Sequence, residues 1–503
     1  MIVGKQPGER EGMEVLAMMG VLMGALLIGH ALQKWKKGGG TETATALALG
    51  MITGMVAYAV QNNPRESKWM RFQEQFFFLF LLPPIIFESG FTMKPKPFFE
   101  NFGAICTFAF LGTLLSTLAV GGLLYIAGKA NLAYPLDLLP CLMFGALISA
   151  TDPVTVLATF QELQVEQNMY ALVFGESVLN DAVAIVLYGT LASIQDAKVR
   201  SPSVLSACGS FVWIFLGSTC VGVLIALLSA ILFKTVRLEQ DGGREGLLET
   251  CVLVCFPYCA YMLSEGVGLS GIVAILFCGI VMSHYTIKNL SEAATNASFS
   301  FFKILAKLAE TFVFIYIGAS VFLEDQSWKH ATLSLFGLFA IFIGRAVNVY
   351  PCGDLINRAR RPGRRVPHNH LHMLWFSGLR GPVAFALAVQ ATSQLGRSSG
   401  NAIMTMTIVI VLFTVFVIGG WTTWALQRMD IQCGAERGLG SPHGTRLPVG
   451  PRMEGENEAD ASNGTTGFDP TAGFASLDEK YLTPFFTLQD EVELTAFARP
   501  ENE

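Results

Sequence analysis

The sequence predicts an all-α protein that crosses a membrane many times. Hydrophobic residues make up 52% of the 503 residues and charged residues 15%, whereas soluble globular chains carry about 25% charged residues. Apolar runs of roughly 20 residues, the length that a helix needs to span a bilayer, recur up to position 426. Basic residues gather in alternate loops, which predicts how the helices are oriented. Proline or glycine interrupts two of the apolar runs, which predicts how the helices are paired.

Hydropathy predicts about 13 transmembrane helices in residues 14–426. Residues 1–13 are expected to form a short polar segment outside the membrane, and residues 427–503 a tail. Tryptophans lie near several span ends, as an aromatic belt at the membrane surface requires. The spans are predicted at residues 14–34, 42–61, 72–91, 101–127, 137–161, 168–194, 204–233, 246–265, 268–285, 301–323, 329–352, 370–394 and 401–426.

Basic residues predict which ends of the spans face the cytosol. The loop at residues 358–365 is rich in arginine, and the positive-inside rule places such a loop in the cytosol. Residues 65–71 carry positive charge on the opposite side, so the bias is not uniform. An odd number of spans then puts the N-terminus outside or in a lumen and the C-terminus in the cytosol. The other basic residues on the cytosolic side are Lys34, Lys36, Lys37, Lys94, Lys96, Lys234, Arg237 and Arg244.

The tail differs from the membrane domain in composition. From Gln427 onward it is rich in Gly, Pro and acidic residues, which is typical of a disordered segment. One stretch, LDEKYLTPFFT at residues 477–487, mixes aromatic and charged residues. It is predicted either to dock on the membrane domain or on a cytosolic partner, or to be a chance aromatic patch in a flexible tail.

Two spans contain helix breakers at matching places. Residues 148–156 read ISATDPVTV and residues 377–385 read SGLRGPVAF. Proline removes a helix hydrogen bond and breaks or kinks the helix. The two spans are seven apart in order and therefore enter from opposite faces, which indicates two inverted six-helix repeats with crossed discontinuous helices. Such pairs mark an ion site near the bilayer midplane, although Pro and Gly are also common in membrane helices.

Two buried carboxylates predict what this site binds. Asp181 lies inside the apolar run 174–191, and Asp152 precedes the break at Pro153. A charge at the centre of a membrane helix costs about 2.5–3.5 kcal/mol and usually marks an ion path. A small cation prefers oxygen ligands, so a cation and a proton would compete for Asp181. The predicted cation- and proton-binding residues are Asp181, Asn180, Asp152, Thr151 and Ser177.

Further charged residues lie at membrane depth. Arg345 needs a partner, and Glu176 is the expected one, which leaves Asp181 available for transport. Arg380 is expected to offset helix-end carbonyl dipoles at the second break. Glu310 is a further acid that the sequence leaves open as a partner of Arg380. For all four residues a purely structural ion-pair network is the favoured interpretation.

Three other features have weaker interpretations. Glu88 is expected either to line a cytosolic funnel or to reach the interface at a helix end. His368, His370 and His372 form a cluster before the second broken span, where a solvated loop is favoured over a pH sensor. No stable metal site is expected there or at the cysteines, which are predicted to pack inside the helices.

Several stretches resemble the eukaryotic sodium/proton exchangers of the monovalent cation/proton antiporter superfamily. The resemblance runs from about Phe72 to Ala425, and HYTIKNLS and DEKYLTPFFT are closest to the endosomal and Golgi-type members. The matching stretches are LLPPIIFESGF, SATDPVTVLATFQEL, FGESVLNDAVAIVLYGTL, SGIVAILFCGIVMSHYTIKNLS, IGRAVNVY and SGLRGPVAFALA.

The resemblance implies the antiporter fold and roles for particular residues. Asp181 is then the ion and proton carrier, and Asp152 helps to form the site. Glu176 pairs with Arg345, while Arg380 supports the crossed helices and Asn180 implies one cation per proton. The family is homodimeric and moves a core domain, elevator-like, against a dimerisation domain. The expected location is an endosomal or Golgi membrane, with the plasma membrane as an alternative.

The sequence therefore predicts an electroneutral antiporter of Na⁺ or K⁺ against H⁺, and not an enzyme. No cofactor is expected beyond the transported ions, and no nucleic-acid partner; the expected partners are the lipid bilayer, a second copy of the chain and a cytosolic partner of the tail. A sodium-coupled symporter of an organic solute is the alternative, but few polar groups for a solute are visible. The sequence shows no filter motif of the kind that an ion channel needs. It also shows no glycine-flanked catalytic aspartate of the kind that an intramembrane aspartyl protease needs.

Overall fold

The computed structural model describes most of the predicted membrane domain and a short piece of the tail. Within these residues the chain is almost entirely helical, with one isolated β-bridge between Val165 and Cys433. The predicted all-α architecture is therefore confirmed. The described residues are 7–35, 41–60, 76–93, 95–196, 204–236, 246–323, 331–361, 365–431, 433, 478 and 482–487.

The described residues form the following helices, in chain order. The first half forms α1 (Pro7–Trp35), α2 (Thr41–Val60), the π-helix η3 (Phe77–Leu81), α4 (Leu82–Phe91), α5 (Pro95–Cys106), the π-helix η4 (Thr107–Gly112), α6 (Thr113–Lys129), α7 (Leu138–Ser149), α8 (Val154–Glu162), α9 (Gln167–Asp196) and α10 (Val204–Val236). The second half forms α11 (Leu247–Gly266), α12 (Gly271–Val281), the π-helix η6 (Met282–Thr286), the 3-10 helix η7 (Ile287–Asn289), α13 (Glu292–Leu323), α14 (Ala331–Ala359), α15 (His368–Phe376), α16 (Pro382–Gln394), α17 (Gly396–Phe413), the π-helix η10 (Thr414–Ile418), α18 (Gly419–Arg428) and, in the tail, α20 (Thr483–Phe486).

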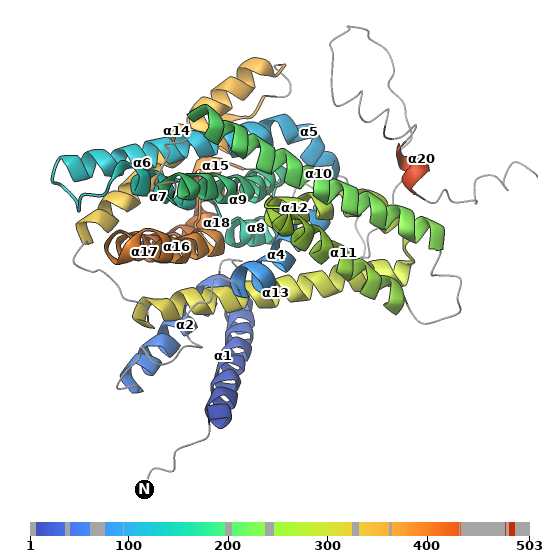
Figure 1. Ribbon diagram of the computed structural model, residues 1–503, viewed down its shortest axis with the longest axis horizontal. Coiled ribbons are helices and arrows are strands. Elements are labelled where there is room, and N and C mark those ends of the chain that lie inside the picture. The colour runs from blue at the N-terminus through green and yellow to red at the C-terminus, as the bar shows by residue number, and fades with distance from the viewer. Residues whose placement is uncertain are drawn as a thin grey trace, which may run out of the picture.

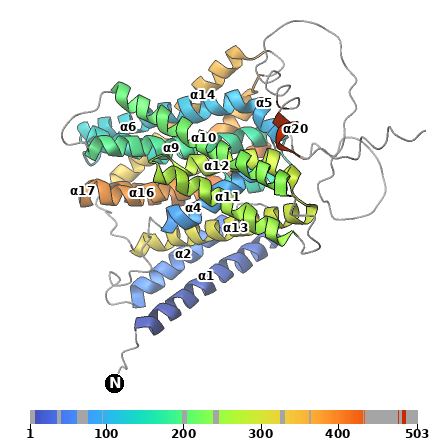
Figure 2. The ribbon, with the colours of Figure 1, turned by 45° about the vertical axis from the view of Figure 1, so that its right-hand side comes forward.

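The helices form two packed groups (Figure 1). In one group α13 packs on α1, α2 and α4, and α12 packs on α4, α10 and α11. In the other group α6 packs on α7 and α14, α9 packs on α5 and α7, and α16 packs on α17. Figure 2 shows the same division after a turn of the molecule, with α1, α2 and α13 below the layer of α9, α16 and α17.

The length and composition of the helices fit a membrane protein. Among the described residues, nine helices are long and apolar enough to cross a bilayer, and Leu16–Leu32 and Phe77–Phe91 are shorter apolar helices. The predicted number of 13 spans stays a prediction. The first helix begins at Pro7, where proline is favoured at the first helical position, and its apolar part is Leu16–Leu32.

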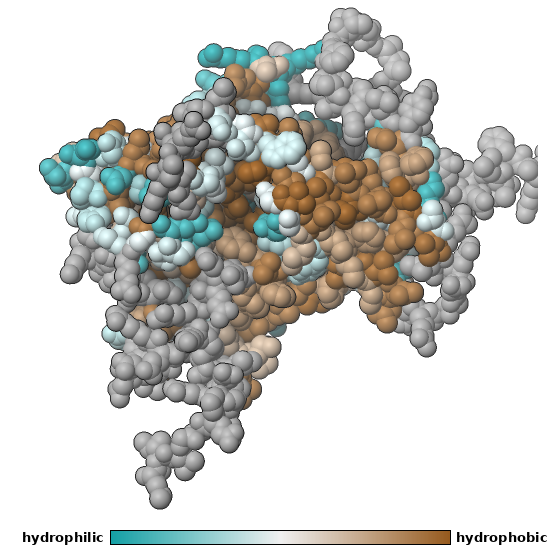
Figure 3. All heavy atoms as spheres, in the orientation of Figure 1, coloured by the Kyte–Doolittle hydropathy of each residue, from teal (hydrophilic) through white to brown (hydrophobic). Residues whose placement is uncertain are grey.

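The outer surface of the helices is hydrophobic. Leu27, Trp213 and Leu335 are 71%, 72% and 66% exposed, and Figure 3 shows a broad brown surface on one side of the molecule. Monomeric soluble proteins rarely expose apolar patches larger than a few hundred Å². The exposed apolar residues therefore form the face that lipid covers.

Both predicted breaks are present, and they cross each other. The first lies between α7 and α8 at residues 150–153, and the second lies between α15 and α16 at residues 377–381. The Asp152 backbone N–H donates to the Leu379 carbonyl at 2.9 Å, which joins the two extended segments. A Cβ on Gly381 would lie 2.5 Å from the Asp152 Cβ, so only glycine permits this close approach.

Candidate functional site

The crossing of the two broken helices encloses a small cavity of about 50 Å³. Three carboxylate residues line it: Asp152 from the first break, Asp181 from α9 and Glu310 from α13. All three residues are at most 9% exposed. Since a cavity of about 10–15 Å³ is enough to hold one water molecule, this cavity has room for a small ion.

Asp152 presents an open ligand position. Its Oδ1 accepts a hydrogen bond from the Val154 N–H at 3.2 Å, which satisfies a backbone donor at the start of α8. Its Oδ2 is buried and has no hydrogen-bond partner within the described part of the chain. A buried carboxylate oxygen without a donor is costly, so this atom is suited to bind a cation or carry a proton.

The neighbouring cations supply too little positive charge to balance the three carboxylates. Arg380 is the cation close to Asp181, and Lys307 is the cation close to Glu310. Lys307 also forms a 2.6 Å ion pair with Glu42, so its charge is shared. Three carboxyl groups around one buried cavity cannot all be ionised without counter-ions. Protons or a bound cation must supply the difference.

Arg380 holds the crossing together from the inside. Its Nη1 donates to the carbonyls of Ser149 and Ala150 at 3.1 and 3.0 Å, the last carbonyls before the first break. Its backbone N–H donates to the Thr414 hydroxyl at 3.2 Å, in the π-helix η10. The side chain is thus placed at helix-end carbonyls, as the sequence predicts. No ion pair joins it to Glu310 among the described residues, so that open alternative is not what the structure shows.

Glu176 and Arg345 are brought together in a buried ion pair. Arg345 Nη1 and Nη2 donate to the two Glu176 carboxylate oxygens at 2.5 and 2.8 Å. Arg345 Nε and Nη2 also donate to the Leu374 carbonyl, at 3.2 and 2.8 Å. Both charges are neutralised and hydrogen-bonded, which is the condition for a stable buried pair.

Two residues of the predicted cation shell lie behind the cavity and do not line it. Asn180 donates to the Ser149 carbonyl at 2.9 Å and to the Thr151 hydroxyl at 3.2 Å. The Ser177 hydroxyl accepts from Thr151 at 3.1 Å. The crossing explains the difference: the broken segment presses against this face of α9 and uses its polar groups to satisfy the freed backbone. Thr151 itself lines the cavity.

Sequence reasoning missed several residues of this site. The Thr113 hydroxyl donates to Asn180 Oδ1 at 2.9 Å and fixes the orientation of that amide. Gly381 permits the crossing, and Ser89 of α4 lines the cavity. A threonine or serine in an apolar run gives no signal of its own. The π-helix that ends just before Thr113 is a feature often found at functional sites, but it is not visible in the sequence.

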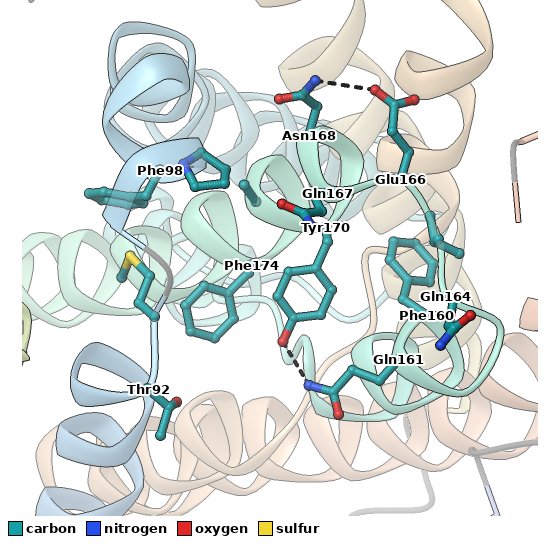
Figure 4. A pocket seen from close by; sticks show the side chains of 14 residues that line it. Thr92, Phe98, Phe160, Gln161, Gln164, Glu166, Gln167, Asn168, Tyr170 and Phe174 are labelled. Carbon is teal, nitrogen blue, oxygen red and sulfur yellow. Dashed lines mark hydrogen bonds between the residues drawn. The ribbon is translucent and has the colours of Figure 1, made fainter. Parts of the chain in front are cut away.

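A larger cavity of about 550 Å³ opens beside the start of α9 (Figure 4). Aromatic rings and amides line it, and two hydrogen bonds, from Gln161 to Tyr170 and from Asn168 to Glu166, order its wall. Thr92, directly after α4, reaches this cavity, and Ser89, three residues earlier, reaches the carboxylate cavity. We name the larger cavity the vestibule, defined by Thr92, Met93, Pro97, Phe98, Phe160, Gln161, Gln164, Val165, Glu166, Gln167, Asn168, Tyr170, Ala171 and Phe174.

The weaker candidates are placed as follows. Glu88 lies on α4, accepts a hydrogen bond from the Thr92 hydroxyl at 3.4 Å and is not among the residues that line either cavity. His370 lies 3.6 Å from Glu166, and His372 lies 2.9 Å from the Tyr350 hydroxyl. In the described residues no group of three or more His, Cys, Asp or Glu side chains is arranged to hold a metal ion.

Crossed broken helices around buried carboxylates define a multi-pass membrane carrier of small cations. The chain belongs to the sodium/hydrogen exchanger family, whose model, described as "Sodium/hydrogen exchanger, transmembrane", matches residues 15–428. The predicted family is therefore confirmed, and antiport is supported over solute symport.

The relatives and one solved structure agree with this assignment. Sodium/hydrogen exchanger 5 of Arabidopsis thaliana is 43% identical over 95% of this chain and 94% of its own length. Sodium/hydrogen exchanger 8 of Homo sapiens is 35% identical over 96% of this chain and 84% of its own. The sodium proton antiporter MjNhaP1 from Methanocaldococcus jannaschii, 19% identical, matches the fold with a TM-score of 0.58 over 83% of this chain and 99% of its own.

Proposed function

We propose that this protein exchanges Na⁺ or K⁺ for H⁺ at the carboxylate cavity, with Asp181 and Asp152 as the residues that bind both. The observation that supports it most directly is the buried Asp152 Oδ2, which has no partner among the described residues and belongs to a cavity shared with Asp181. A cation that fills this cavity is coordinated by carboxylate oxygens. A proton on the same carboxylates removes the charge that attracts the cation.

Exchange then follows from competition for the same oxygens. A cation that enters from one side displaces a proton, and the loaded cavity opens to the other side. The Glu176 charge is balanced by Arg345 in an ion pair, and Asn180 is uncharged. The proposed stoichiometry is one cation for one proton, which makes transport electroneutral, as the resemblance of the Asn180-Asp181 pair to electroneutral relatives implies.

The arrangement of the cavity suggests how access alternates. Asp152 and Asp181 belong to the group of α7, α8 and α9, whereas Ser89 and Glu310 come from α4 and α13 in the other group. A displacement of one group against the other would open the cavity to one side and close it to the other. We propose that residues 14–426 form this transport domain, that two copies associate through the group of α1, α2 and α13, and that the vestibule is the cytosolic entrance.

The proposal includes the placement of the protein in the cell. The N-terminus faces a lumen or the exterior, and residues 427–503 lie in the cytosol, where a partner can bind them. The endosomal or Golgi membrane is the proposed location, on the resemblance of HYTIKNLS and DEKYLTPFFT to those members. The protein acts as a transporter without catalytic chemistry or a cofactor.

Reconstitution into proteoliposomes tests the proposed function. Internal pH and cation content are recorded together after an outward proton gradient is imposed, with Na⁺ or K⁺ outside. We expect cation uptake matched by proton efflux, in a ratio of about one to one. Cation uptake without proton movement, or uptake that requires an organic solute, would contradict antiport.

A further inference from the structure

A piece of the tail is docked on the membrane domain. Asp478 and residues 482–487 lie against the end of α10 and against η6 and η7. Figure 1 shows α20 as the red element beside α10. We name Asp478 and residues 482–487 the docking segment. Its described contacts are made to α10, η6 and η7.

The docking surface offers hydrogen-bond donors, and the segment offers acceptors. Lys234 Nζ donates to the carbonyls of Pro484 and Phe485, both at 2.8 Å. These carbonyls lie at the C-terminal end of α20, where a positive charge is favoured. The Asn289 amide donates to the Phe486 carbonyl at 2.7 Å. Three separate carbonyls of the segment are thus bound by side chains of the membrane domain.

An acidic residue anchors the other end of the segment. The Asp478 carboxylate accepts a hydrogen bond from the Tyr285 hydroxyl, and its second oxygen lies 2.8 Å from His284 Nε2. Burial alone would raise the pKa of Asp478, but the hydrogen bonds from Tyr285 and His284 outweigh it and hold this pKa below its ordinary value. The carboxylate is therefore charged at cytosolic pH. The Phe486 ring also packs on the Tyr285 ring, with centroids 5.5 Å apart.

The segment covers the junction between α10 and the end of α12. The Asn289 amide donates to the Ala230 carbonyl of α10 at 3.0 Å as well as to Phe486. Ser229 of α10 and Thr286 of η6 share a 2.7 Å hydrogen bond beside it. Because the Asn289 side chain of η7 hydrogen-bonds to both α10 and the tail, the bound segment stabilises the position of this end of α10.

The other half of α10 packs on the ion-binding helix. Phe215 joins a buried cluster with Ala182 and Val183, which follow Asp181 directly in α9. Phe215 also packs edge-on against Phe110 of η4, with centroids 4.8 Å apart. The 19 positions from Phe215 to Lys234 correspond to about 28 Å of helix. One rigid helix therefore connects the docking surface to the helix that carries Asp181.

We propose that the docking segment acts as an intramolecular clamp that fixes the end of α10 to η6 and η7 and thereby restrains the movement of α9 against α10. The clamp slows turnover without touching the ion site. This inference rests on the proposed function for its effect on transport. The docking itself does not depend on that function.

Lys234→Met and Asp478→Asn in the full-length protein test the clamp. Each removes docking contacts and keeps the size of the side chain, and Lys129→Met at the end of α6 is the matched control. Hydrogen–deuterium exchange in nanodiscs follows the Thr487 amide, which donates to the Thr483 carbonyl at 2.9 Å. We expect its exchange to become at least about tenfold faster in both variants and to stay unchanged in the control.

Transport by the same proteins in proteoliposomes tests the restraint. We expect the maximal rate to rise about twofold or more in both variants, with an unchanged apparent cation affinity, because the clamp stabilises one arrangement of α10. Unchanged protection in the variants would overturn the docking. Lost protection with an equal or lower maximal rate would overturn the restraint. If the unmodified protein exchanges no cation for protons, the proposed function fails, whereas the exchange data still decide the docking.

Discussion

Two carboxylates of α9 have opposite surroundings although they are five residues apart. Glu176 is 0% and Asp181 is 9% exposed, and five positions turn the helix by about 140°. Glu176 faces the Arg345 guanidinium, which binds both of its oxygens. Asp181 faces a cavity that it shares with two other acids. Burial is common to both, so the presence of a fixed cationic partner is what separates a structural carboxylate from an ion-binding one.

The largest expected effect comes from the carboxylate without a fixed ion-pair partner. Asp181→Asn removes the charge that a proton and a cation share, and it keeps the side-chain volume. We expect cation-driven proton flux in proteoliposomes to be abolished, with the thermal unfolding temperature of the purified protein nearly unchanged. Asp137→Asn, an exposed aspartate at the start of α7, is the matched control and should transport normally. Substantial cation-driven proton flux in Asp181→Asn would contradict the proposed mechanism.

The pH dependence of cation affinity is a second test of the ion-binding carboxylate in this comparison, Asp181. If one carboxylate must lose a proton before a cation binds, the apparent cation affinity falls about tenfold per pH unit below the pKa of that carboxylate. At a fixed cation concentration, transport should therefore rise as cytosolic pH rises. Flux at several values of pH and cation concentration measures this. An affinity that does not change with pH, or a current that scales with transport on a solid-supported membrane, contradicts one-for-one competition.

Replacing the paired carboxylate, Glu176, should lower the stability of the protein. Glu176→Gln leaves the Arg345 charge buried without its partner, which typically costs about 3–5 kcal/mol. We expect a clearly lower unfolding temperature or poor expression. The matched control is Glu42→Gln, which breaks the partly exposed pair with Lys307 and should cost about 0–1 kcal/mol. If the two variants are equally stable, the buried pair does not have the proposed structural role.

The sequence predicts this contrast only in part. Asp152, Asp181 and Arg345 are visible because a charge in an apolar run is costly, and the two breaks are visible because proline and glycine interrupt helices. The pairing of Glu176 with Arg345 also follows, since an intramembrane arginine needs an acid. These inferences depend on local residue chemistry alone.

Other parts of the site depend on how distant segments meet. Nothing in the sequence near Glu310 says that α13 brings it to the cavity of Asp181, because α4 and α13 reach that cavity through helix packing. Helical spacing predicts that Ser177 faces the cation together with Asp181, and Asn180 is counted among the cation-binding residues although it shares a face with Glu176. The crossing segment occupies that face of α9 instead, and no helical periodicity reports where a crossing segment lies.

The crossing itself should be sensitive to a single methyl group. In Gly381→Ala the new Cβ would lie 2.5 Å from the Asp152 Cβ, so the two extended segments must separate and Asp152 must move. We expect at least a tenfold loss of apparent cation affinity, by analogy with an overpacking cost of about 1–3 kcal/mol. Gly122→Ala in α6, where no atom lies within 4 Å of the added Cβ, is the control. Equal transport by the two variants would show that the close approach is not required.

The smallest expected effect tests whether Asn180 positions the first break or binds the ion. Thr113 donates to Asn180 Oδ1, and Thr113→Val removes that donor while keeping the shape of the side chain. Leaving a buried acceptor unsatisfied costs about 1–3 kcal/mol, so the unfolding temperature should fall slightly. Thr117, four residues further along α6, is the matched control, because its hydroxyl has no hydrogen-bond partner within the described part of the chain. Thr117→Val should be neutral or slightly stabilising.

If Asn180 positions the break, Thr113→Val lowers stability and changes cation affinity only modestly. If Asn180 binds the ion directly, affinity falls much more than stability, and the assignment of Asn180 to the layer behind the cavity is wrong.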